Sequence, residues 1–393
     1  MRHTAPLLLM VGLSACALLP DFYLPLGEDE DEAETEPQRE DLIPAILANT
    51  ATRVVAPALE SFKKESGLLD EAVRAWSTAP DDATLAAAQQ QWVTTMVSWQ
   101  YLEVMQIGPA GAEWNTTGGM DLRDEIYSWP LVSGCRVDQE TTYGEWMEPD
   151  WLSDQIVMVY GLDALEHLLF AGMENDCPDQ LDINADGSWD AMSDADIVTS
   201  RSKMAEEVAR HLASTGSELH AQWVNEFSPQ LLDASLYESS EHALGEVYSA
   251  LLYISYYTED RKLGQPLGLL ENTQPVPEDV EHPLSGISVA SISTNLVGSR
   301  ALFTGDGGPG FDEFLAAMGH ADLSEAFLLE VDEAIEAAAA IDQPLEEAII
   351  AGDPLVGALH SEIADVSALL DGDILTVLTL QIPIDTSIPG SGD

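Results

Sequence analysis

Apolar residues recur every three or four positions along most of the chain, which is the spacing of a buried helix face. Polar–apolar alternation with a period of two residues is nearly absent before Ile374, so strands are not expected. The pattern predicts helices at 42–64, 69–77, 82–106, 151–170, 194–227, 237–261, 285–302, 310–318, 322–341, 344–351 and 354–370. We therefore predict an all-α protein.

The predicted helices fall into two sets, and a chain of 393 residues is too long for one small core. We expect two packed helical bundles, one over 42–193, which includes an acidic loop, and one over 194–393. A single continuous helical body is the alternative. Within the first bundle, Asp81 and Asp82 are expected to cap a long helix that Gly108-Pro109 ends.

The first residues have the pattern of an export signal. Arg2 and His3 precede an apolar run that is too short to span a bilayer, and the run ends in Leu13-Ser14-Ala15-Cys16. This ending resembles a bacterial lipobox, which predicts a signal peptide over 1–15 and a lipid anchor on Cys16. An ordinary secretory signal is the alternative. Residues 16–41 are acidic and proline-containing, and we expect a tether. The predicted location is the cell envelope, facing the periplasm or on the cell surface.

Charge limits the partners of the chain. Seventy acidic residues stand against 14 basic ones, for a formal net charge of -56. Nucleic acids and anionic lipid headgroups would be repelled, so we exclude both as partners. Membrane attachment is expected through the lipid only.

Besides Cys16, the sequence contains Cys135 and Cys177. An even pair in an exported protein is typical of a disulfide, although two free thiols are the alternative. Two cysteines are too few for a cysteine-rich zinc module.

The segment 158–170 contains the most informative group of polar residues. Asp163, Glu166 and His167 lie at positions i, i+3 and i+4 of a predicted helix and can share a patch. An apolar stripe beside them consists of Met158, Leu162, Leu165 and Leu169. A mixed carboxylate–imidazole set suits iron, manganese or zinc. The alternative is a hydrogen-bonded polar cluster that joins the bundles, with Asp163 or Glu166 paired to Arg123.

A second metal candidate follows in the acidic loop. Asp182, Asn184, Asp186 and Asp190 lie at positions 1, 3, 5 and 9 of a loop with glycine at position 6, as in the first half of an EF-hand calcium loop. Ser193 stands at position 12 in place of glutamate. We expect either a calcium-ordered loop or a flexible acidic turn.

Several motifs, taken in order, resemble the imelysin family over roughly residues 42–393. They are Trp92, Trp99 and Glu103 before Ile107-Gly108-Pro109; Ile126-Tyr127-Ser128-Trp129-Pro130; Gly161 through Gly172; Lys262 through Gly268; and Glu281 to Ser285. The third resembles the family signature Gly-x-His-x-x-Glu, with Asp163 in place of the histidine and His167 where an aromatic residue is usual.

This resemblance implies two helical bundles that face each other, with the signature helix lining the site between them. It also implies a periplasmic or surface protein connected with iron uptake. On this basis Glu103 joins Asp163, Glu166 and His167 as a candidate metal ligand. Glu281, Ser285 and Trp99 are expected to surround the ligands.

We therefore expect a lipoprotein that binds a metal ion or a metal-containing ligand in iron acquisition, with an iron-transport protein as a partner. Iron or another divalent or trivalent metal is the expected ligand, and a loosely held haem near His167 or His282 is a further option. One alternative is a metallopeptidase, but the patterns His-Glu-x-x-His and Gly-x-Ser-x-Gly are absent, so we favour a protein that is not an enzyme. The other alternative is a non-catalytic acidic interaction lipoprotein.

Overall fold

The computed structural model describes residues 39–148, 150–270 and 273–380. The predicted signal peptide, the lipid anchor at Cys16 and most of the acidic tether lie outside these residues. The described residues form helices and connecting turns without a strand, which confirms the all-α prediction.

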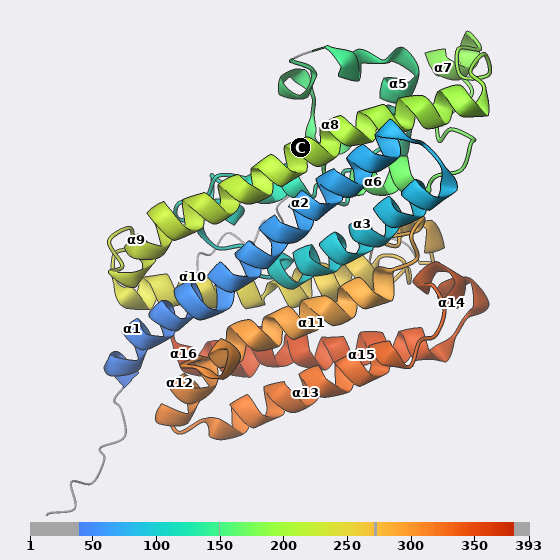
Figure 1. Ribbon diagram of the computed structural model, residues 1–393. Coiled ribbons are helices and arrows are strands. Elements are labelled where there is room, and N and C mark those ends of the chain that lie inside the picture. The colour runs from blue at the N-terminus through green and yellow to red at the C-terminus, as the bar shows by residue number, and fades with distance from the viewer. Residues whose placement is uncertain (1–38, 149, 271–272, 381–393) are drawn as a thin grey trace, which may run out of the picture. The chain divides into compact units, whose positions relative to one another are not determined.

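The first group of helices packs around one long helical stretch (Figure 1). This stretch runs through α1 (Arg39–Asn49), the π-helical turn η1 (Thr50–Val55) and α2 (Ala56–Thr78). Helix α2 packs against α3 (Asp82–Glu103) and α8 (Asp194–Gln222), and α6 (Gly161–Phe170) packs against both α3 and α8. Asp81 caps α3 as predicted, because its carboxylate accepts hydrogen bonds from the backbone N–H groups of Ala83 and Thr84.

The second group consists of α11 (Ser288–Thr304), α13 (Ala321–Ala339), α15 (Pro354–Ala368) and the π-helical segment η7 (Ile254–Gly264). Helix α13 packs against α11 and α15, and η7 packs against α11 and α15. The two groups meet where α11 packs against α3. This arrangement agrees with two bundles. The boundary predicted at residue 194 does not coincide with it, because α8 packs with α2 and α6 of the first group.

Shorter helices connect and cover these groups. They are α4 (Leu122–Ile126), α5 (Gly134–Tyr143), α7 (Asp182–Ala185), α9 (Ser228–Leu232), α10 (Ser240–Leu251), α12 (Phe311–Ala317), α14 (Leu345–Ala351) and α16 (Leu375–Leu378). Single 3₁₀ turns lie at 108–110, 145–147, 151–154, 157–159, 277–279 and 305–307, and further π-helical turns at 223–227 and 369–374.

The helices predicted at 42–64 and 69–77 are one continuous helix. Gly67 lies in the gap between the two predicted helices, but in the structure it is part of the helix, and a Cβ added to it would have no neighbour within 4 Å. A helical glycine costs about 1 kcal/mol relative to alanine. Burial of Phe62, Leu69 and Val73 on either side of Gly67 offsets this cost.

The stretch Asp41–Thr78 is long and apolar enough to cross a membrane by length and composition alone. Just over half of its most apolar window, 56%, is buried inside the fold. The stretch packs against α3 and α8, so we interpret it as a core helix.

The helix predicted at 151–170 is shorter in the structure. Residues 151–159 form two 3₁₀ turns, and α6 begins only at Gly161, whose φ of 93° favours glycine. A Cβ at Gly161 would also lie 2.9 Å from the carbonyl oxygen of Ile126. Met158 therefore lies outside the helix that carries the rest of the predicted apolar stripe.

Candidate functional site

Helix α6 directs its three polar residues toward different neighbours. Asp163, Glu166 and His167 are all buried, with 4–5% of each residue exposed. Successive residues of an α-helix are rotated by about 100°, so Glu166 and His167 point to different sides. The predicted metal set of Asp163, Glu166, Glu103 and His167 is consequently divided among separate groups, as described next.

Asp163 is bound by the segment that precedes Trp129-Pro130. Its Oδ2 accepts hydrogen bonds from the hydroxyl of Ser128 at 2.6 Å and from the backbone N–H of Ser128 at 3.2 Å. Its Oδ1 accepts from the backbone N–H of Ala164 at 3.0 Å. Burial outweighs these hydrogen bonds and raises the pKa of Asp163 from 3.8 to about 6. Asp163 is thus a buried carboxyl group that takes up a proton more readily than an exposed aspartate.

We expect Asp163→Asn to remove part of the pH dependence of folding. A folded-state pKa of about 6, above the ordinary 3.8, stabilises the fold at low pH, and this contribution is lost as the pH rises through 6. The full difference corresponds to about 3 kcal/mol. Urea unfolding of both proteins between pH 4 and pH 7 should show the wild type losing stability relative to Asp163→Asn. Parallel curves for the two proteins would contradict the raised pKa.

Glu166 reaches the second bundle. Its Oε2 lies 3.0 Å from His282 Nδ1, and its Oε1 accepts a hydrogen bond from the backbone N–H of Ser285 at 2.8 Å. His282 is fully buried, with its ring edge-on to Trp92 and stacked near Tyr127. Glu166 therefore orients a histidine from the other bundle.

Glu103 and Glu281 share a buried lysine. Lys262 Nζ lies 3.0 Å from Glu103 Oε2 and 2.8 Å from Glu281 Oε1, and all three side chains are fully buried. Arg123 Nη2 lies 3.3 Å from Glu103 Oε1. Glu103 is thus occupied by two cations, and Arg123 pairs with Glu103 instead of with Asp163 or Glu166. The expected alternative, a polar cluster joining the bundles, is present with different pairs.

Uncharged side chains complete this network, in which Gln100 and Tyr127 donate to Glu281 Oε1 at 2.8 and 2.9 Å. Lys262 also donates to Gln100 Oε1 and to Asn295 Oδ1. We call the set Gln100, Glu103, Arg123, Glu166, Lys262, Glu281 and His282 the inter-bundle site.

Two atoms of the inter-bundle site face each other without a hydrogen bond. Glu281 Oε2 and His282 Nε2 are 3.6 Å apart, and neither forms a hydrogen bond with any residue that the structure describes. Burial by itself would lower the pKa of His282, but Glu281 and Glu166 outweigh it and raise this pKa above its ordinary value. Burial would likewise raise the pKa of Glu281, but Lys262 and His282 outweigh it and lower this pKa. The arrangement therefore attracts positive charge.

Of the residues expected around the ligands, Ser285 contributes its backbone, while its hydroxyl is buried and unpaired within the described part of the chain. Trp99 packs against Phe62 in the core, with its ring centroid 5.1 Å away. Trp99 is thus a core residue, and it lines a small cavity together with Glu103 and Arg123 of the inter-bundle site.

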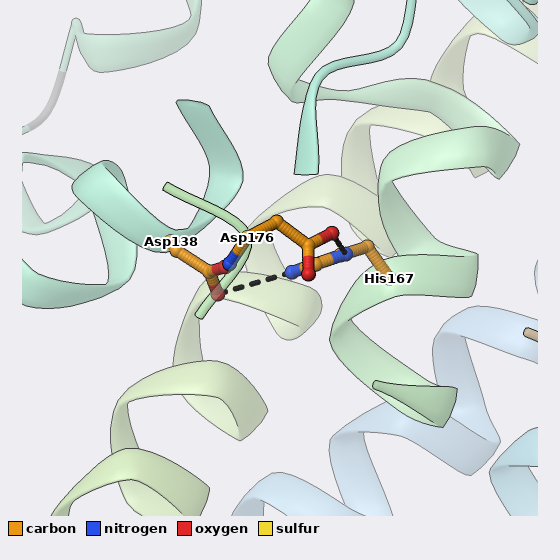
Figure 2. Close-up of side chains that lie close together, drawn as sticks. All are labelled: Asp138, His167 and Asp176. Carbon is orange, nitrogen blue, oxygen red and sulfur yellow. Dashed lines mark hydrogen bonds and ion pairs between the residues drawn. The ribbon is translucent and has the colours of Figure 1, made fainter. Parts of the chain in front are cut away.

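His167 belongs to a different group, which includes neither Asp163 nor Glu166. Its Nε2 lies 3.0 Å from Asp138 Oδ1, and its Nδ1 lies 3.5 Å from Asp176 Oδ2 (Figure 2). A disulfide between Cys135 and Cys177 lies next to Asp176 along the chain and confirms the predicted pairing.

The predicted calcium loop does not converge on one point. Asp182 starts the short helix α7, and the Asn184 side chain turns toward Asn175 and the Cys177 carbonyl. Asp186 accepts a hydrogen bond from the backbone N–H of Ser188, and Asp190 is exposed. Because Asn184 is committed to the loop that carries Cys177, the EF-hand arrangement is absent here.

With this geometry in place, comparison with known proteins identifies the family. The family model described as Imelysin matches residues 55–371. The chain belongs to the imelysin family. No curated protein matches the chain significantly.

Two solved structures share the imelysin fold with this chain. One is a protein from Parabacteroides distasonis ATCC 8503, provisionally described as an iron-regulated protein A precursor, with 16% identity and a TM-score of 0.69 over 88% of this chain and 97% of that one. The other is an imelysin-like protein from Psychrobacter arcticum 273-4, with 18% identity and a TM-score of 0.68 over 88% of this chain and 98% of that one. At these identities the likeness concerns the fold.

One feature of the sequence indicates the buried cations of the inter-bundle site. The whole chain contains only 14 lysines and arginines. A charged side chain that is buried against an apolar face needs a partner of opposite charge. Lys262 lies between Tyr257 and Leu263, both of which are buried. Its position in a mostly buried segment could have indicated a buried lysine. Its partners Gln100 and Asn295 could not be identified, because they lie on distant helices.

Proposed function

We propose that this imelysin-family protein binds a metal ion or a metal-containing ligand at the inter-bundle site, as part of iron acquisition. We further propose that it is held in the cell envelope by a lipid on Cys16 and that an iron-transport protein is its partner. Glu281 and His282 supply the ligand atoms, and Glu166 orients His282. This reverses the roles expected for Glu166 and Glu281 from the sequence.

The observation that carries the proposal is that Glu281 Oε2 and His282 Nε2, both buried, face each other at 3.6 Å without a hydrogen bond to any residue that the structure describes. Metal-binding histidines usually present one ring nitrogen to the metal while the other is held by a carboxylate or carbonyl. His282 has this arrangement, since Glu166 holds Nδ1 and leaves Nε2 facing Glu281. A carboxylate oxygen and an imidazole nitrogen are suitable ligands for iron, manganese or zinc.

Charge supports a cation at the same place. Four buried carboxyl groups, on Asp163, Glu166, Glu103 and Glu281, stand near only two permanent cations, Lys262 and Arg123. His282 takes up a proton in this environment, because the neighbouring carboxylates raise its pKa. A metal ion bound at His282 would replace that proton and balance the same negative charge. The metal would be the bound ligand of the protein, and the proposal assigns it no catalytic role.

The comparisons support the iron context at a coarser level. One structural neighbour is described as an iron-regulated protein A precursor. The acidic chain, with its net charge of -56, would also raise the local concentration of cations.

The proposal can be tested with the double variant Glu281→Gln/His282→Gln. After chelation and reloading with Fe²⁺, Mn²⁺ or Zn²⁺, elemental analysis should find one metal ion fewer per chain than in the wild type. At a hundredfold excess over the dissociation constant, binding at one site stabilises a fold by about 2.7 kcal/mol, and the variant should lack this gain in thermal unfolding.

Glu278→Gln/His320→Gln is the matched control, because Glu278 is exposed and His320 half-buried, and neither side chain belongs to the inter-bundle site. The control should retain the metal content and the stabilisation of the wild type. Equal metal content in the site variant and the control would overturn the proposal and favour an acidic interaction lipoprotein.

A further inference from the structure

We infer a second metal site, for a divalent transition-metal ion such as Zn²⁺, between His167 Nδ1 and Asp176 Oδ2. This site lies between α6 and the loop that follows it, and it shares no residue with the inter-bundle site. Figure 2 shows the three side chains that form it, Asp138, His167 and Asp176. One ligand atom from each of them lies within 4.8 Å of the others.

Asp138 is fully buried on α5. Its Oδ1 lies 3.1 Å from Arg201 Nη2, and its Oδ2 accepts a hydrogen bond from the backbone N–H of Asp176 at 2.9 Å. Arg201 is itself held in place by hydrogen bonds to the carbonyl oxygens of Ala171 and Gly172. Asp138 is therefore a fixed carboxylate that can only accept hydrogen bonds.

The contact with Asp138 selects the tautomer of a neutral His167 ring. Its Nε2 lies 3.0 Å from Asp138 Oδ1, so Nε2 carries the proton and donates it. In the neutral imidazole the other nitrogen, Nδ1, then has a free lone pair. A carboxylate that orients a histidine in this way is the usual outer partner of a metal-binding histidine.

On the other side of the ring, His167 Nδ1 faces Asp176 Oδ2. His167 Nδ1 and Asp176 Oδ2 are 3.5 Å apart, whereas a charge-assisted N–H···O bond measures about 2.7–2.9 Å. A lone pair facing a carboxylate is repulsive without a cation between them. Bonds of about 2.0–2.2 Å to each atom at a tetrahedral angle would place the two ligand atoms about 3.4 Å apart, which is close to the observed separation.

Two features of the surroundings bear on access to the two ligand atoms. The Asp176 side chain is 61% exposed, so water can reach the ion and fill its remaining positions. On the other side, Gly134 approaches closely. A Cβ at this position would lie 2.3 Å from Asp176 Oδ2 and 2.9 Å from His167 Nδ1. The absence of a side chain at residue 134 thus keeps both ligand atoms free.

Zinc titration of the intact protein by isothermal calorimetry, with Asp176→Asn as the test variant, distinguishes this site from the inter-bundle site. Asp176 is exposed, so its replacement should leave the fold intact. We expect Asp176→Asn to weaken one zinc-binding event at least tenfold. Asp179→Asn, an exposed aspartate in the same loop, is the matched control and should bind zinc as the wild type does.

The number of zinc ions bound separates the two proposals. If both hold, the wild type binds two ions and Asp176→Asn binds one. If only the site at His167 exists, the wild type binds one ion and Asp176→Asn binds none. Identical titrations for Asp176→Asn, Asp179→Asn and the wild type would overturn the site at His167, whatever happens at the inter-bundle site.

Discussion

Lys262→Met should destabilise the protein by about 3–5 kcal/mol, the usual effect of removing one partner from a buried ion pair. Lys262 is fully buried, and its Nζ contacts Glu103, Glu281, Gln100 and Asn295 at 2.6–3.0 Å. Methionine keeps the apolar stem but takes the lysine cation away from both Glu103 and Glu281 in a buried setting. Chemical denaturation monitored by circular dichroism measures the loss.

Two further variants make this prediction specific to charge. Lys64→Met removes a lysine that is 67% exposed and paired with Glu65, and it should change stability by about 1 kcal/mol or less. Adding Glu281→Gln to Lys262→Met removes one of the two buried carboxylates that lose Lys262, so the double variant should recover part of the loss. If the double variant lost more stability than the two single variants lose together, the charge explanation would be wrong.

Arg201→Met should cost about as much, roughly 3–5 kcal/mol, at the other side of α6. Arg201 neutralises the fully buried Asp138 and ties down the two carbonyl groups that follow α6. Without it, Asp138 remains buried, with His167 and the backbone N–H of Asp176 as its remaining partners. Thermal and urea unfolding of the two proteins at pH 7 measures the difference.

Helix α8 itself provides the control for Arg201. Arg210 lies on the same helix, is 56% exposed and pairs with Glu207 at the surface, so Arg210→Met should be nearly neutral. Arg201→Met combined with Asp138→Asn should be more stable than Arg201→Met alone. Equal losses for Arg201→Met and Arg210→Met would show that the buried charge pair is unimportant.

Much of the helical architecture could be predicted from the sequence, because buried helix faces repeat every three or four residues. Two differences between prediction and structure lie at glycines. Gly67 stands in the gap between two predicted helices but lies within one helix whose flanking residues are buried, so packing outweighs its poor helix propensity. Gly161 was placed inside a helix but begins one, because its backbone adopts a positive φ.

The candidate site could be predicted only in part. The sequence identified α6 and its polar residues, and their burial agrees with that choice. Spacing at i, i+3 and i+4 did not reveal that Glu166 and His167, rotated by about 100°, would face different partners. Those partners, His282 and Asp138, are 116 and 29 residues away in the sequence. Such pairs depend on how the helices pack, which a pattern along one chain does not encode.

We propose that Glu281 and His282 together bind a cation at the inter-bundle site. Anomalous diffraction from crystals grown with Zn²⁺ or Fe²⁺ would locate that cation. We predict an anomalous peak about 2.0–2.2 Å from both Glu281 Oε2 and His282 Nε2, with Glu166 still bound to Nδ1. A map with no peak there, in crystals that contain the metal elsewhere or in solvent, would contradict the claim.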